Sequence, residues 1–110
     1  MTKKKEEGME LGVFDRLILL NILPKEGDFL TLKIVRQMRE DLSFTEAEHK
    51  ALQFVQEEGN VRWKKEADKP KTIGFGVKAT EIIVDVLKDL DKSKKLKDEH
   101  FGLYEKFVIE

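Results

Sequence analysis

The sequence predicts a single α+β domain that is mostly helical, with three helices, then a small antiparallel sheet, then two C-terminal helices. Two observations support this fold class. Apolar residues recur with helical spacing along most of the chain, but they alternate with polar residues between residues 61 and 75, which is the period of a strand. The chain has 110 residues, and 40% of them are hydrophobic. This length is typical of one domain, and a disordered chain would lack such apolar content.

The most apolar segment, residues 11–23, is expected to form the central helix. One side of its helical wheel holds Val13, Phe14, Leu17, Ile18 and Leu20. Asp15 and Arg16 form a polar wedge on the other side. After Arg16 only Asn21 is polar, so we expect the other elements to cover the second half of this helix on nearly all sides. Pro24 ends the helix because a proline cannot continue the hydrogen-bond ladder.

Two further helices are expected before the sheet. The first of them spans about residues 31–41 and has a core-facing stripe of Ile34, Val35, Met38 and Leu42. The next begins near Glu46, because Thr45 and Glu48 have the spacing of a capping box. Ser43 and Glu46 are a second candidate for this box. The apolar face of that helix is small, which predicts a short helix at the edge of the core; its members are Ala47, Ala51, Leu52 and Val55.

The sheet is expected from two antiparallel strands at residues 61–65 and 71–75, joined by the polar loop KEADKPK. A third strand at residues 53–57 would pair with the first across the tight turn EEGN. The alternative is that the preceding helix runs on through residues 53–57, and the sequence leaves this choice open.

Two helices close the chain. Thr80 is expected to cap the first, which should lie against the helix at residues 11–23 with a stripe of Ile82, Ile83, Val86, Leu87 and Leu90. Asp98 is expected to cap the last, whose broad apolar face should close the core; that face is Phe101, Leu103, Tyr104, Phe107 and Val108. Residues 10–110 would then form the globular domain and residues 1–9 a flexible, solvated tail.

Composition and charge exclude several classes. The chain has 21 basic and 22 acidic residues, and this near-neutral balance disfavours a dedicated nucleic-acid binder. It has no cysteine, so it has no disulfide framework and no thiolate chemistry. Glu6, Glu7 and Glu10 interrupt the pattern of a signal peptide, and the apolar segment is about a third too short to span a bilayer. We therefore expect a cytoplasmic protein without a membrane partner.

No residue pattern predicts catalysis, a cofactor or a metal site. His49 and His100 each follow a glutamate, but neither has a second histidine at metal-ligand spacing. Gly74 and Gly76 flank Phe75 without the third glycine or the lysine–serine pair of a phosphate-binding loop. We expect that the chain is not an enzyme and that it has no cofactor.

The basic residues offer one alternative. Six basic and two acidic residues lie between Arg62 and Lys78, on the expected hairpin. A helix pair followed by a basic hairpin is similar in order to a winged-helix DNA-binding domain. In that case the nucleic-acid-binding residues would be Lys33, Arg36, Arg39, Arg62, Lys64, Lys65, Lys69 and Lys71. Glu46 and Glu48 oppose it, because they lie at the start of the helix that would approach the phosphates. The simpler interpretation is that the lysines protect an exposed edge strand.

The segments RLILLNILPKEGD, FGVKATEIIVDVL and LYEKF resemble small proteins without an assigned function that are encoded in bacteriophage and prophage genomes. The resemblance covers most of the chain from Leu11 onward and brings no site residues. It implies a cytoplasmic protein of an infected bacterium that acts on a host or phage protein. The leading functional hypothesis is a non-enzymatic binding module whose ligand is a protein or a second copy of itself. It rests on the aromatic-rich last helix, the dense mixed-charge surface and the absence of catalytic residues. The alternative is a winged-helix-like nucleic-acid binder.

Overall fold

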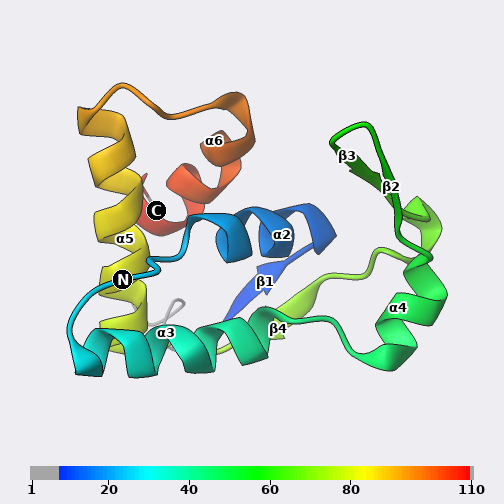
Figure 1. Cartoon of the computed structure of the whole chain (residues 1–110), viewed down its shortest axis with the longest axis horizontal. Coiled ribbons are helices and arrows are strands. Elements are labelled where there is room, and N and C mark those ends of the chain that lie inside the picture. The colour runs from blue at the N-terminus through cyan, green and yellow to red at the C-terminus, as the bar shows by residue number, and fades with distance from the viewer. Residues whose placement is uncertain (1–7, 110) are drawn as a thin grey trace.

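The computed structural model describes residues 8–109, which form five α-helices packed with two small sheets (Figure 1). The helices are α2 (Val13–Ile22), α3 (Phe29–Leu42), α4 (Glu46–Leu52), α5 (Val77–Lys92) and α6 (Asp98–Tyr104). The strands are β1 (Met9–Leu11), β2 (Val55–Glu57), β3 (Asn60–Arg62) and β4 (Lys71–Ile73). A 3-10 turn, η1 (Lys65–Ala67), precedes β4, and a π-helical turn, η2 (Glu105–Ile109), continues α6. The predicted α+β class and the order of its helices are confirmed.

Local hydrogen bonds explain the starts of α3 and α4. The Asp28 carboxylate accepts the backbone N–H of Thr31 at 2.8 Å and so caps α3. The Thr45 hydroxyl accepts the N–H of Glu48 at 3.1 Å, and the Glu48 carboxylate accepts the N–H of Thr45 at 2.8 Å. The predicted capping box of Thr45 and Glu48 is therefore confirmed. Both caps supply acceptors for backbone N–H groups that the start of a helix leaves unpaired.

The predicted caps of the last two helices are wrong. Buried Phe75 leads directly into α5, which begins at Val77 with Gly76 as its cap, so Thr80 lies inside the helix. The Thr80 hydroxyl is buried and has no hydrogen-bond partner in the described part of the chain. In α6, Asp98 is already a helical residue. At the start of α6, the backbone N–H of Lys97 donates a hydrogen bond of 3.0 Å to Nδ1 of His100.

The core lies where α2, α3, α5 and the C-terminal turn meet. Its fully buried side chains include Leu19 of α2, Leu42 of α3 and Leu87 of α5, each 0% exposed. Phe107 of η2 packs edge-to-face on Phe75 with ring centroids 5.5 Å apart, so the terminal segment closes the core as expected. Phe101, which was expected on the same apolar face, is 66% exposed and does not take part. The main helical contacts of α5 are with α3, α6 and η2 rather than with α2.

The α2 helix is rotated relative to the wheel predicted from its sequence. Val13, Ile18 and Leu19 are buried, but Phe14 is 47% exposed. Arg16, expected in a polar wedge, is 1% exposed and is the largest fully buried side chain. The helix is central as predicted, since it contacts α3, α6 and β1, but part of its cover is polar.

The strand pairing differs from the prediction. Residues 61–65 and 71–75 do not form a hairpin, because β3 pairs with β2 and β4 pairs with β1. The β2–β3 pair closes over a two-residue turn in which Glu58 and Gly59 both have positive φ, 46° and 82°, as the favoured hairpin turns require. A two-residue closure costs less chain entropy than the longer loop. One of the two alternatives for residues 53–57 is thereby confirmed: they contain a strand, and it pairs with the strand that follows the turn EEGN.

The β1–β4 pairing includes a residue of the expected N-terminal tail. Met9 lies opposite Ile73 in the β1–β4 sheet, so the expected tail at residues 1–9 does not include it; residues 1–7 are outside the described part.

The α4 helix ends at Gln53, which adopts a left-handed conformation with φ 50°. Figure 1 shows the result: α4 and the β2–β3 hairpin form an arm on the side of the molecule away from α5.

Candidate functional site

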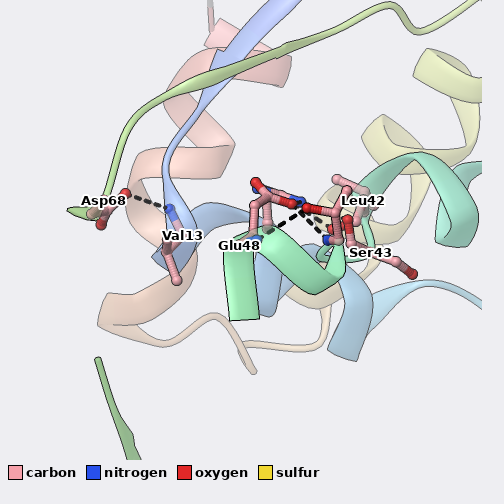
Figure 2. Close-up of polar contacts among 7 residues, drawn as sticks. Val13, Leu42, Ser43, Glu48 and Asp68 are labelled. Atoms are coloured by element: carbon pink, nitrogen blue, oxygen red, sulfur yellow. Dashed lines mark hydrogen bonds and ion pairs between the residues drawn. The ribbon is translucent and has the colours of Figure 1, made fainter. Parts of the chain in front are cut away.

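The arm is held to the core by Arg16, through contacts we call the Arg16 junction. Its guanidinium donates to the carbonyl oxygens of Leu42 (3.1 Å) and Ser43 (2.6 Å) and to both carboxylate oxygens of Glu48 (2.7 and 3.2 Å). It also lies 3.9 Å from the centre of the Phe44 ring. Figure 2 shows these bonds converging on the turn between α3 and α4. Four of the five guanidinium N–H donors are engaged within the chain, so the junction serves to position α4.

Hydrogen bonds from Arg16 hold the pKa of Glu48 at about 2, well below its ordinary value of 4.5. The backbone N–H of Thr45 and the positive charge of Lys71 act in the same direction, and partial burial opposes them. Glu48 is therefore ionised over the physiological range, and its charge is already neutralised by Arg16.

A second contact fixes the chain that follows the hairpin. The carboxylate of Asp68 accepts the backbone N–H of Val13 at 3.1 Å (Figure 2). It also accepts the indole N–H of Trp63 at 3.2 Å. A carboxylate at the first turn of α2 also interacts favourably with the helix dipole. Asp68 thus places residues 64–72 beside the start of α2 and across from α4.

Four aromatic side chains of the arm lie next to one another. Phe44, His49, Phe54 and Trp63 form a series of edge-to-face contacts with centroids 5.1–6.2 Å apart. The Lys65 ammonium lies 4.3 Å from the centre of the Trp63 ring. Phe44, Phe54 and Trp63 are half-buried and His49 is exposed, so these contacts join the elements of the arm to one another at its surface.

Between α4 and residues 64–72 lies a groove of about 760 Å³, which we call the α4 groove. Apolar side chains line much of it: Val13, Ala47, Ala51, Leu52, Ala67 and Pro70. Charged side chains also line it: Glu48, Lys64, Glu66, Lys69 and Lys71. Because Arg16 already neutralises Glu48, the uncompensated charge of this lining is positive. The groove can accept an apolar surface with acidic groups beside it.

A second groove, of about 580 Å³, lies between α3 and the loop that follows α2; we call it the α3 groove. Its cationic lining consists of Lys25, Lys33, Arg36 and Arg39. Glu40 and Gln37 complete the polar lining, and the apolar lining is Pro24, Phe29, Leu32 and Val35. In contrast to the α4 groove, this groove holds four cations and a single carboxylate.

The structure divides the basic residues that the sequence grouped together. Lys33, Arg36 and Arg39 lie in the α3 groove, whereas Lys64, Lys69 and Lys71 lie in the α4 groove. Arg62 pairs with Glu57 across the hairpin at 3.2 Å, and Lys65 contacts Trp63. The expected basic hairpin does not form, because residues 71–73 pair with β1 and not with residues 61–65. The hairpin that does form, β2–β3, carries Glu57, Glu58 and Arg62. Lys25, Ala47 and Ala51 were missed by sequence reasoning, although the spacing of the two alanines placed them on one face of α4.

The two histidines have different surroundings. His49 belongs to the aromatic series of the arm, while His100 is 5% exposed and accepts the N–H of Lys97. Between residues 8 and 109, no group of three or more histidine, aspartate or glutamate side chains is placed to hold a metal ion.

Comparisons with models of protein families, with curated proteins and with solved structures find no match to this chain. None of the helices described between residues 8 and 109 combines the length and the apolar character that a membrane span requires.

Proposed function

We propose that this chain is a non-enzymatic binding module that holds a segment of a protein partner in the α4 groove. The observation that carries the proposal is the combination of an apolar lining with Lys64, Lys69 and Lys71, none of which has an ion-pair partner among the described residues. A partner segment with apolar side chains and flanking carboxylates would match both features.

The position of the groove supports a protein ligand over a nucleic acid. The exposed start of α4 carries Glu46, and the neighbouring hairpin carries Glu58; neither has an ion-pair partner among the described residues. These carboxylates would repel a phosphate backbone along the face that a winged-helix domain presents to DNA. A peptide meets less repulsion from these carboxylates than a phosphate backbone does, because it carries only a few acidic groups. Each of these groups can pair with a single lysine of the groove.

The setting we propose is the cytoplasm of an infected bacterium, with a host or phage protein as the partner. This part of the proposal rests on the resemblance to phage-encoded proteins. A second copy of the chain is the competing occupant of the groove. Light scattering distinguishes the two, because a dimer that dissociates when the α4 groove is blocked would identify the chain itself as the ligand.

A peptide-display selection tests the proposal. Random peptides are selected on the wild-type chain and then measured on Ala51→Arg, which fills the groove from an exposed helical position. Enriched peptides should combine apolar and acidic residues and lose at least about tenfold in affinity on Ala51→Arg. Gln56→Arg, which adds the same side chain to exposed β2, is the matched control and should bind like the wild type. Absence of enriched peptides, or equal binding to Ala51→Arg, would overturn the proposal.

A further inference from the structure

The cationic lining of the α3 groove has no part in the proposed binding of a protein segment. It lies on α3 and the preceding loop, and its lining shares no residue with the α4 groove. We propose that the α3 groove is a binding site for single-stranded nucleic acid, in which the cations contact phosphates and Phe29 stacks on a base.

The cations are available for an anionic ligand. Among the described residues, no carboxylate lies within ion-pair distance of Lys25, Lys33 or Arg36. Arg39 donates one hydrogen bond to the carbonyl oxygen of Pro24 at 3.4 Å, which holds its side chain across the loop. The nearby carboxylate of Asp28 caps α3 by accepting the N–H of Thr31, and its pKa is lowered by the Thr31 hydroxyl and by this N–H, so it stays ionised.

The cations also have a regular spacing. Lys33 and Arg36 are three residues apart on α3 and therefore lie on neighbouring turns of one helix face. Lys25 reaches the same groove from the loop. The only carboxylate in the lining, Glu40, is one turn beyond Arg36 at the far end. The charge therefore favours a polyanion with several phosphates in sequence.

Phe29 decides which polyanion fits best. This first residue of α3 lines the groove and is 82% exposed, so its ring face is available to a flat partner. Aromatic rings in a cationic groove are typical of single-strand binding, because unpaired bases stack on them. A duplex would keep its bases stacked internally and leave Phe29 without a role. A membrane surface would require more than Phe29 and the adjacent, 58% exposed Leu30.

Fluorescence anisotropy with labelled oligothymidylate of about 16 nucleotides tests the site. The wild type should bind at about 50 mM salt, and log K should fall against log salt with a slope of about −2 to −3, as for three or four phosphate contacts. Lys33→Glu combined with Arg36→Glu should weaken binding by at least about tenfold and flatten the slope. Phe29→Ala should weaken binding by about tenfold while leaving the slope unchanged.

The control is Lys88→Glu combined with Lys92→Glu, which reverses two exposed charges on α5 away from the groove. It should bind like the wild type, and circular dichroism should show that all variants keep their helices. If a charge-reversed variant fails to fold, Lys33→Gln with Arg36→Gln replaces it. Absence of binding, equal losses in groove and control variants, preference for a duplex of the same length, or stronger binding to anionic vesicles would each overturn the proposal. None of these outcomes bears on the α4 groove.

Discussion

Arg16 is buried in the structure, although the sequence around it places it on the polar side of its helix. A helical wheel compares a residue only with its own helix, and on that basis Arg16 belongs with Asp15 on the polar side. The acceptors that allow its burial come from Leu42, Ser43 and Glu48, far along the chain. The capping role of Glu48 was predictable from its spacing to Thr45, but its second role required the tertiary structure.

Replacing Arg16 by methionine should lower the free energy of unfolding by about 3 kcal/mol, because two carbonyl oxygens and the Glu48 carboxylate lose their donors. We place the value at the low end of the range for a broken buried pair, since the Glu48 side chain is 28% exposed. Urea unfolding measures the change. Lys88→Met, at an exposed site, is the control and should stay within about 0.5 kcal/mol of the wild type. A loss below about 1 kcal/mol for Arg16→Met would contradict the account of the junction.

The lowered pKa of Glu48 predicts that the free energy of unfolding depends on pH. Its pKa in the folded chain is about 2, against an ordinary value of 4.5. Because the folded state holds this proton less tightly than the unfolded state, the associated stability is fully present above about pH 4.5 and is lost as the pH falls toward about 2. The difference in unfolding free energy between the wild type and Glu48→Gln should therefore narrow across this window. A difference that does not change with pH would show that Glu48 is not held ionised by Arg16.

At the scale of the elements, sequence patterns predicted the helices and offered the β2–β3 pair as one of two alternatives, but they gave the wrong partner for β4. The stripe on α5 and the capping box of α4 depend on neighbours in sequence, so they could be found without the structure. The pairing of β4 with β1 could not, because Met9 and Ile73 are distant in sequence and the β1 segment has no strand pattern of its own. The expected basic hairpin was wrong for this reason, and the division of its lysines could not be predicted.

The central helix provides an element-scale prediction. Leu19→Ala in α2 should lower the free energy of unfolding by about 2–5 kcal/mol, because Leu19 is 0% exposed in the core. Phe14→Ala on the same helix should cost less than about 1.5 kcal/mol, since Phe14 is 47% exposed. Thermal or urea unfolding of the two variants measures the difference. Equal losses, or a larger loss for Phe14→Ala, would restore the orientation that the helical wheel predicted.

At the scale of the whole molecule, the net charge of −1 conceals an uneven distribution. The α3 groove is lined by four cations and one carboxylate, while α5 exposes several acidic residues: Glu81, Asp85, Asp89 and Asp91. Lys33, Arg36 and Arg39 could be placed on one helix from sequence alone. The loop residues Pro24 and Lys25 complete the groove only because α2 and α3 fold against each other. The total charge therefore argued against nucleic acid more strongly than the surface does.

The Arg16 junction sets α4 against residues 64–72, and we propose that the groove between them holds a protein segment. Nuclear magnetic resonance of the ¹⁵N-labelled chain, titrated with a peptide from the display selection, tests it most directly. The account predicts that the largest amide shifts fall on Ala47, Ala51, Ala67 and Thr72, with those of Phe29 to Gln37 unchanged. Shifts centred on α3 or α5, with α4 unaffected at saturation, would contradict it.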